Sequence, residues 1–281
     1  MIFGRIFAWI QYLLPQHALS RLILHATRVR TPWFKNALVR GFLKLYSVDM
    51  SEAEQSNPYA YASFNEFFTR ALKEDARPID VAPRSIACPV DGVVSEAGSI
   101  EGARLLQAKG RSYTLAELLA AEQWASLFEG GCFATIYLAP FNYHRIHMPV
   151  AGNLQETVYV PGRLFSVNGV TAAYVPRLFA RNERVLTLFD SAFGQFALIM
   201  VGALNVGSMS TVWAGDITPA ARRVLTRLPP QRVALDKGAE LGRFNMGSTV
   251  ILLFQRNRAQ LLAGVRAGTT VRLGQSLGLL Q

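Results

Sequence analysis

Cysteine, histidine and lysine are scarce in this sequence, and each shortage excludes a kind of site. The two cysteines, Cys88 and Cys132, give neither metal-ligand spacing nor a disulfide framework, so no metal is expected. Isolated cysteines of this kind suit a reducing, cytoplasmic setting. None of the five lysines lies in a recognisable pyridoxal-phosphate motif, so that cofactor is not expected either. No segment has the run of about 18 or more apolar residues that a membrane span needs.

Apolar and basic residues are abundant instead. Hydrophobic residues make up 51% of the 281-residue chain, which is enough for a sizeable core. The 29 basic and 19 acidic side chains give a net charge of +10. Such a charge favours an anionic partner, which could be nucleic acid, anionic lipid or a phosphorylated substrate, but charge alone does not distinguish a partner from general surface solvation.

Residues 1–50 combine seven basic side chains and a single acidic one, Asp49, with many large apolar residues. Pro15 and Pro32 divide the region into three short segments with helical spacing. Helices of this kind fit a role at a membrane surface, with about 1 kcal/mol of attraction per basic residue to anionic lipid; the alternative is a helical cap on the core. Gln11 interrupts the first apolar stretch, so we do not interpret it as a signal peptide. That choice favours the cytoplasmic face of the membrane.

The rest of the chain changes from helical to strand-like patterns. Capping boxes predict one short helix that opens at Ser63 and another from Thr114 to about Leu127. Apolar runs typical of strands occupy residues 133–138, 157–160, 185–189, 196–206, 210–213, 249–254 and 260–265. We therefore expect an α+β fold, with amphipathic N-terminal helices in residues 1–50 and a mainly antiparallel, sandwich-like or barrel-like core in residues 51–281.

Gly247 and Ser248 stand directly before the strand predicted for residues 249–254. Glycine allows a close approach to its carbonyl group, and the serine hydroxyl follows that carbonyl along the chain. If a base activates the hydroxyl, it can attack the preceding peptide bond and form an ester, which would cut the chain. On these residues alone, a turn that leads into a strand explains the pattern better.

Three further side chains could take part in such chemistry. Asp91 precedes a glycine, a pair that is usually a turn. His144 and His147 lie three residues apart, and an imidazole near neutral pH suits a base or a proton shuttle. Asp91, His147 and Ser248 could serve as the orienting group, base and nucleophile of a triad, provided that they lie close together. The Gly-x-Ser-x-Gly signature of hydrolases is absent around Ser248.

These residues lie in motifs through which the chain resembles the bacterial and mitochondrial phosphatidylserine decarboxylases. The resemblance covers nearly the whole chain, although the first 50 residues match only in character. One departure is Met246, where the family usually has leucine, a residue of similar volume. The matching motifs are Phe64-Asn65-Glu66-Phe67-Phe68, Arg77-Pro78-Ile79-Asp80, Pro89-Val90-Asp91-Gly92, Tyr143-His144-Arg145, His147-Met148-Pro149, Pro161-Gly162, Leu164 to Asn168, Leu178 to Arg184, Val201-Gly202-Ala203, Val212-Trp213-Ala214-Gly215 and Gly242-Arg243-Phe244.

The resemblance implies that the chain cleaves itself. Ser248 would attack the Gly247 carbonyl, with His147 as base and Asp91 as the orienting group, and the ester would break by β-elimination. The new N-terminal residue would become a covalent pyruvoyl group with release of ammonia. The β chain, residues 1–247, and the α chain, residues 248–281, would stay associated, and two such αβ units could form a homodimer.

The resemblance also implies the reaction of the mature protein, which belongs to phospholipid biosynthesis. The pyruvoyl group would form a Schiff base with phosphatidylserine, release carbon dioxide and yield phosphatidylethanolamine. His144 is our candidate for proton handling after cleavage. We expect a peripheral protein on the cytoplasmic face of the inner membrane, which binds an anionic membrane surface and no nucleic acid.

Two alternatives remain. A serine hydrolase would use the same triad on an external ester and would keep Ser248 in an intact chain. A non-catalytic membrane-binding protein would need the basic N-terminus but neither Ser248 nor the two histidines. The mass of the protein under denaturing conditions separates both alternatives from a self-cleaving decarboxylase.

Overall fold

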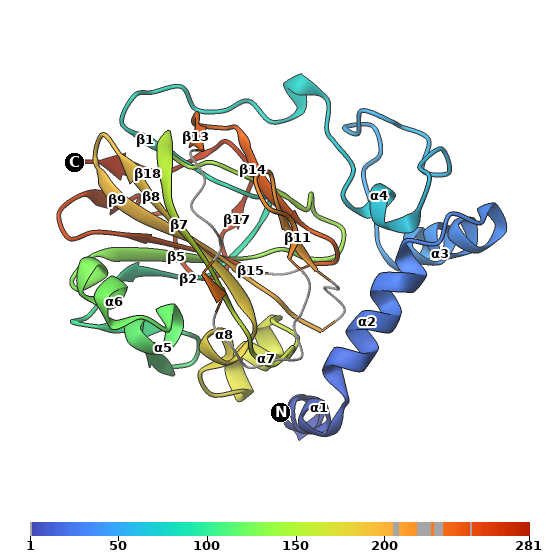
Figure 1. Ribbon diagram of the computed structural model, residues 1–281, viewed down its shortest axis with the longest axis horizontal. Helices are drawn as coiled ribbons and strands as arrows, with labels where there is room; N and C mark the ends of the chain where they lie inside the picture. Colours follow the sequence, from blue (N-terminus) through green and yellow to red (C-terminus); the bar gives the residue numbers. More distant parts are fainter. Residues whose placement is uncertain (1, 205–207, 218–225, 228–232, 248) are drawn as a thin grey trace.

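Helices precede a β-rich body in this chain, as the α+β prediction required (Figure 1). The computed structural model describes residues 2–204, 208–217, 226–227, 233–247 and 249–281. The helices are α1 (Ile2–Leu13), α2 (Gln16–Thr27), α3 (Pro32–Leu45), α4 (Phe64–Phe68), α5 (Leu115–Leu119), α6 (Glu122–Phe128), α7 (Gly169–Tyr174) and α8 (Leu178–Arg181), with a 3₁₀ turn at Glu74–Ala76.

Helices α1, α2 and α3 lie along one side of the β body (Figure 1). Pro15 directly precedes α2, and Pro32 occupies the first turn of α3, where its fixed φ and missing N–H are tolerated. Trp9 is 73% exposed and Leu13 is 87% exposed, although Ala8 on the same helix is buried in the core. Helix α1 therefore packs on the body with one face and exposes large apolar side chains on another. No helix within the described ranges is both long and apolar enough to cross a bilayer.

Both predicted helix starts are confirmed, but only the second has the full capping box, and that second helix is shorter than predicted. The Ser63 hydroxyl accepts from the Glu66 N–H, and Thr114 forms a reciprocal capping box with Glu117. The helix predicted to continue to about Leu127 is broken at Ala120, which has a φ of 52° in the left-handed region. Its N–H caps the carbonyl of Ala116, and α6 begins two residues later.

All pairs of named strands are antiparallel in the described chain. The largest sheet runs β12–β7–β8–β9–β15–β5–β2–β17, with β13 also on β7. Its members are β12 (Thr226–Arg227), β7 (Gly152–Val160), β8 (Arg184–Ser191), β9 (Gly194–Val201), β15 (Thr249–Phe254), β5 (Cys132–Tyr137), β2 (Gly92–Ser99), β17 (Thr270–Val271) and β13 (Ala234–Leu235). Within the described residues this sheet is open, not a closed barrel.

Within the described ranges, three smaller sheets complete the body. Their orders are β1–β18–β16, β11–β10–β14–β6 and β3–β4. The strands are β1 (Ser85–Ala87), β18 (Ser276–Leu280), β16 (Ala259–Leu261), β11 (Gly215–Ile217), β10 (Met209–Thr211), β14 (Glu240–Phe244), β6 (Arg145–His147), β3 (Arg104–Leu106) and β4 (Ser112–Thr114).

Strand β15 lies in the interior of the largest sheet, between β5 and β9, and has the predicted bounds. Every residue of β15 is buried, because its apolar run meets side chains on both faces. Strands β9, β10 and β16 end earlier than their apolar patterns predict. The β15 placement puts Gly247 two residues before the start of this buried strand, where the chain enters the sheet.

Candidate active site

The chain between β14 and β15 carries the predicted cleavage position and is held by a polar network. Asn65 of α4 donates from Nδ2 to the carbonyl oxygen of Asn245 at 2.8 Å. The Asn245 backbone N–H donates to the Ser208 carbonyl at 3.0 Å, and its side-chain Nδ2 reaches the Ser210 hydroxyl at 3.0 Å. These contacts fix the backbone two residues before Gly247. Ser248 itself lies outside the described residues.

His144 lies beside Gly247. A Cβ placed on Gly247 would lie 3.6 Å from Cε1 of the fully buried His144 ring. This ring stacks on Phe68 with centroids 4.1 Å apart, and its Nε2 is 3.2 Å from the Pro140 carbonyl. Because a carbonyl oxygen only accepts, Nε2 carries the proton and Nδ1 is left as an acceptor without a partner among the described residues. Burial lowers the pKa of His144 to about 3, so the ring is neutral near pH 7.

His147, on β6, has partners on both ring nitrogens. Nδ1 is 2.8 Å from the Gly238 carbonyl and must donate to it, so Nε2 accepts from the Tyr143 hydroxyl at 3.0 Å. Burial lowers the pKa of His147, although the bond to the Gly238 carbonyl opposes this shift. His147 is therefore a neutral base whose lone pair meets a tyrosine hydroxyl.

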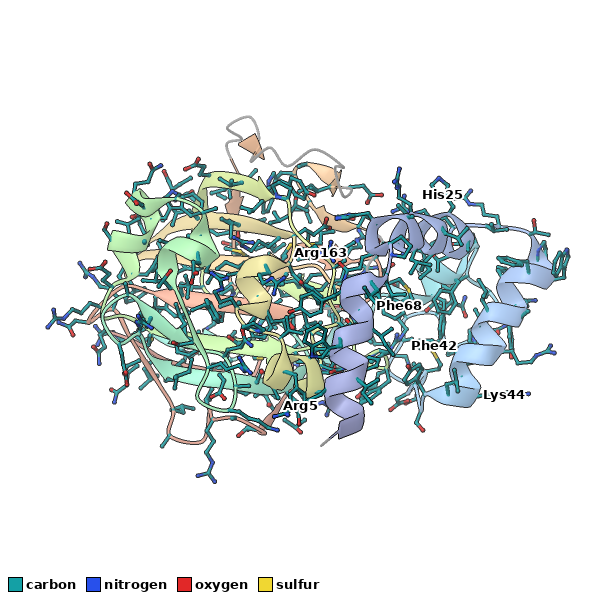
Figure 2. The ribbon with its side chains drawn as sticks, turned by 90° about the horizontal axis from the view of Figure 1, so that it is seen from below. Arg5, His25, Phe42, Lys44, Phe68 and Arg163 are labelled. Atoms are coloured by element: carbon teal, nitrogen blue, oxygen red, sulfur yellow. The ribbon has the colours of Figure 1, made fainter. Side chains whose placement is uncertain are left out.

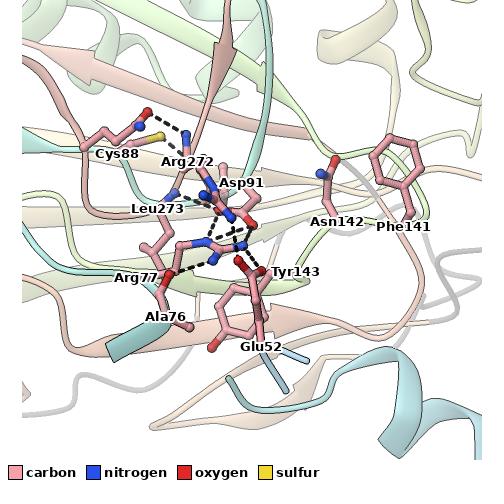
Figure 3. A network of polar contacts seen from close by, with 12 residues as sticks. Glu52, Ala76, Arg77, Cys88, Asp91, Phe141, Asn142, Tyr143, Arg272 and Leu273 are labelled. Atoms are coloured by element: carbon pink, nitrogen blue, oxygen red, sulfur yellow. Dashed lines mark hydrogen bonds and ion pairs between the residues drawn. The ribbon is translucent and has the colours of Figure 1, made fainter. Parts of the chain in front are cut away.

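Asp91 precedes β2 and belongs to a buried ionic network (Figure 3). The Arg77 guanidinium donates to its carboxylate from Nε at 2.9 Å and from Nη2 at 2.7 Å, and the Leu273 N–H donates at 2.8 Å. Arg77 also pairs with Glu52 at 2.8 Å, and Arg272 reaches the other oxygen of Glu52 at 2.6 Å. Hydrogen bonding to Arg77 lowers the pKa of Glu52 despite its partial burial.

Asp91, His144 and His147 lie in one region of the structure, but no hydrogen bonds among the described residues link all three side chains. The backbone N–H of His147 donates to the Pro89 carbonyl, two residues before Asp91. No hydrogen bond joins the side chains of Asp91 and His147 in the described part of the chain. Tyr143 is hydrogen-bonded to His147, and it lines a cavity of about 230 Å³ that Asp91 also lines.

Sequence reasoning did not single out Tyr143, Arg77 or Glu52 as parts of the site. Two of them stand in motifs that carried the family resemblance, Tyr143 beside the histidine pair and Arg77 before Pro78. That position was the available signal. Burial raises the pKa of Tyr143 to about 12, so its hydroxyl keeps its proton at neutral pH and can donate to His147.

An apolar cavity of about 280 Å³ opens beside Gly247. Phe42 of α3 and Phe68 of α4 line it, with ring centroids 5.8 Å apart (Figure 2). Ser166 and Asn168 are polar residues of its lining. The remaining lining residues are Tyr46, Tyr137, Leu138, Pro140, Val167, Ala203, Leu204 and Met246. The arrangement suits an amphipathic ligand whose reacting group lies at Gly247 and His144.

The described side chains contain no group of three or more histidines, cysteines and carboxylates arranged to hold a metal ion. Both cysteines are free. The described side chains offer imidazole, tyrosine, carboxylate and guanidinium groups at this site.

Comparison with known proteins agrees with this geometry. The family model described as phosphatidylserine decarboxylase matches residues 64–279, and a second model, described as PSD, matches residues 6–47. A phosphatidylserine decarboxylase proenzyme from Ectopseudomonas mendocina is 54% identical over 99% of this chain and 99% of the relative. Proteins of the same name are 53% identical in Pseudomonas fluorescens (98% and 97% covered) and 52% identical in Methylococcus capsulatus (98% and 96% covered).

Proposed function

The chain belongs to the phosphatidylserine decarboxylase family of carboxy-lyases, and from this premise we propose that it converts phosphatidylserine to phosphatidylethanolamine. The observation that carries the proposal is the position of Gly247, directly before Ser248, at an apolar cavity beside a neutral imidazole. A phospholipid needs both an apolar volume for its chains and polar groups at its reacting head. The word proenzyme in the relatives' names fits a chain that is cut to become active.

We further propose that Ser248 attacks the Gly247 carbonyl with His147 as base. Asp91 stays the predicted orienting group, although the Gly238 carbonyl, and not Asp91, accepts from Nδ1 of His147. The lowered pKa of His147 supports a base that is unprotonated at neutral pH. The Tyr143 hydroxyl donates to Nε2 of His147, so it can relay a proton to that nitrogen. The acyl group moves from nitrogen to the serine oxygen, β-elimination breaks the ester, and hydrolysis of the remaining enamine gives ammonia and the new N-terminal carbonyl.

The surroundings of Gly247 fit a pyruvoyl group, because the unpartnered Nδ1 of His144 lies buried beside this position. When formed, the group supplies an electron sink for the loss of carbon dioxide. His144 would position the substrate carboxylate or return a proton after that loss, and the surrounding aromatic side chains would exclude water. The observed separation of the two histidine environments supports different roles for them.

We also propose that α1, α2 and α3 attach the protein to the cytoplasmic face of the membrane. The exposed Trp9, Leu13, Trp33 and Leu45, each more than 70% exposed, support this attachment. The homodimer of the αβ unit stays a prediction. Sedimentation of the intact protein with phospholipid vesicles tests the attachment, and a protein that stays in the supernatant would refute it.

Denatured mass is the measurement that tests the catalytic proposal. The wild type should give two fragments, residues 1–247 and 248–281, with the smaller one blocked by pyruvate. Ser248→Ala and His147→Ala should stay intact, and His144→Ala should be cleaved yet inactive on phosphatidylserine. A wild type that stays uncleaved but hydrolyses an external ester would contradict self-processing and favour a hydrolase.

Tyr143→Phe separates two routes to the base. If the tyrosine hydroxyl relays the proton, this variant should stay uncleaved although His147 is present. If His147 acts directly, the variant should cleave at least as fast as the wild type, because the bond to Nε2 is gone. Arg266→Gln, which removes an exposed cation elsewhere, is the control for general effects of substitution.

A further inference from the structure

A second pocket, away from Gly247, lies between α1, α7 and the turn that joins β3 to β4. Its volume is about 690 Å³, and its lining carries three basic side chains and no acidic one. The basic residues are Arg5, Lys109 and Arg111. Among the described residues, none of the three forms an ion pair with a carboxylate. Figure 2 shows Arg5 at the free end of α1, beside the helices that follow residue 168.

A single aromatic ring, that of Tyr174, contacts two of these cations, and the third, Arg111, donates from Nε to the Ala173 carbonyl at 3.1 Å. The Tyr174 ring has the Lys109 ammonium 5.1 Å from its centroid and the Arg5 guanidinium at 5.9 Å. A Cβ placed on Gly4 would lie 3.0 Å from Cε2 of the same ring, so glycine lets α1 approach closely. Arg5 and Trp9 are four residues apart and share one face of α1.

The turn places Lys109 in an unfavourable backbone conformation. Lys109 has a φ of 49° and Gly110 a φ of 71°, and the Arg111 N–H donates to the Ala108 carbonyl at 3.0 Å. Asparagine and glycine are the residues that favour such positions, so a lysine there costs stability. The strain is sustained because Gln107 clamps the hairpin to α7, donating to the Ala172 carbonyl at 2.7 Å. The turn is therefore fixed to α7 and holds the Lys109 charge at this pocket.

We propose that this pocket binds the phosphate of an anionic membrane phospholipid that is not the substrate. The proposal rests on the membrane attachment argued above and names its specific contact. Trp9 of α1 lines the pocket and is exposed, and Leu13, further along the same helix, is exposed as well, so both would meet the acyl chains. A headgroup held there would fix how the protein sits on the membrane.

The fold connects this pocket to the cavity at Gly247. Asn168 caps the N-terminus of α7 and lines that cavity, and Tyr174 ends α7 in the cationic pocket. Gln11 of α1 donates to the Ser166 hydroxyl at 3.1 Å, and Ser166 lines the same cavity. A lipid bound between α1 and α7 would therefore orient the cavity toward the bilayer from which the substrate comes.

Lys109→Asn is the sharpest variant, because asparagine tolerates the left-handed conformation while removing the charge. Arg266→Gln removes an equal charge from an exposed site without such a pocket. On phosphatidylcholine vesicles that contain phosphatidylglycerol, Lys109→Asn should bind about fivefold more weakly than Arg266→Gln, and Arg5→Gln/Lys109→Asn about 25-fold more weakly. On vesicles of phosphatidylcholine alone, all variants should bind equally. Self-cleavage and turnover of a soluble short-chain phosphatidylserine should not change.

If the wild type does not bind vesicles at all, the attachment proposal is refuted, but tryptophan fluorescence still tests the pocket. Short-chain phosphatidylglycerol should change the fluorescence of Trp9, identified by its loss in Trp9→Phe, and Lys109→Asn should weaken that response. If inorganic phosphate saturates the site at the same concentration as short-chain phosphatidylglycerol, the ligand is a soluble anion and the lipid proposal is refuted. Equal responses of Lys109→Asn and Arg266→Gln would overturn the site itself.

Discussion

Replacing Arg77 by methionine removes the only cation that contacts the Asp91 carboxylate among the described residues. The side chains of Arg77 and Asp91 are 9% and 8% exposed, so an unpaired Asp91 has little access to water. Breaking a buried pair by removing one partner costs about 3–5 kcal/mol. Glu52, at 26% exposure, keeps Arg272, so Asp91 carries most of this cost. For a chain of this length about 2 °C corresponds to each kcal/mol, and the melting temperature should fall by about 6–10 °C.

Thermal unfolding at pH 7 measures this effect in a Ser248→Ala background, where no variant is cleaved, and a double-mutant cycle assigns it. Asp91→Asn keeps an acceptor for the Leu273 N–H but removes the charge. Arg77→Met/Asp91→Asn should therefore be about 2–3 kcal/mol more stable than the two single changes predict by addition. Arg266→Met, at an exposed position, should stay within about 0.5 kcal/mol of the wild type.

Acidification supplies an independent check through Glu52. Its bond to Arg77 lowers its pKa below the ordinary 4.5, so the stabilisation is present above that pH and is lost as the pH falls through the lower folded-state value. The difference in free energy of unfolding between the wild type and Arg77→Met should become smaller below about pH 4.5. Two results would refute a stabilising role for the Arg77–Asp91 pair: strict additivity in the cycle, or a melting temperature of Arg77→Met within about 1 °C of the wild type.

Three other changes have defined outcomes. Burial raises the pKa of Glu183 from 4.5 to about 7, so its protonated form stabilises the fold at low pH and that contribution is lost as the pH rises through 7. In urea unfolding, the free energy of unfolding of Glu183→Gln should match that of the wild type near pH 4.5 and exceed it by about 3 kcal/mol at pH 8. A difference that does not change with pH would contradict this. Asn65→Ala removes a hydrogen bond of about 1–1.5 kcal/mol to the Asn245 carbonyl and should slow the appearance of fragments about tenfold, whereas an unchanged time course would exclude a positioning role. The fragments should co-elute in native gel filtration, because residues 250–254 bury five apolar side chains worth about 1.5–3 kcal/mol each; separation without denaturant would count against this placement of β15.

Sequence patterns predicted those elements whose cause is local. The strand over residues 249–254 has its predicted bounds because an apolar run of this length suits a strand buried on both faces. Thr114 and Glu117 form the predicted capping box because both partners lie within four residues. The helix after Thr114 was predicted too long, because alanine favours helix and nothing in the sequence marks Ala120 as left-handed.

The contacts of the site depend on distant backbone atoms, which side-chain patterns do not reveal. A triad predicts a carboxylate at Nδ1 of His147, but the Gly238 carbonyl occupies that position. That partner lies 91 residues away and contributes no side chain. The role of Arg77 likewise depends on a fold that brings Glu52 and Asp91 to one guanidinium. The family resemblance located the segments, and only the fold shows how they pair.

His144 and His147 illustrate why spacing alone does not assign chemistry. Both rings are neutral because burial lowers their pKa values, yet their lone pairs have different surroundings. The Nδ1 of His144 lies unpartnered among the described residues beside Gly247, whereas Nε2 of His147 must first give up the Tyr143 hydroxyl or act through it. A base that acts in a single early proton transfer can have its lone pair hydrogen-bonded to a tyrosine hydroxyl before that step. A group that meets a substrate at every turnover benefits from a lone pair that is already free, and this difference favours an early role for His147 and a repeated one for His144.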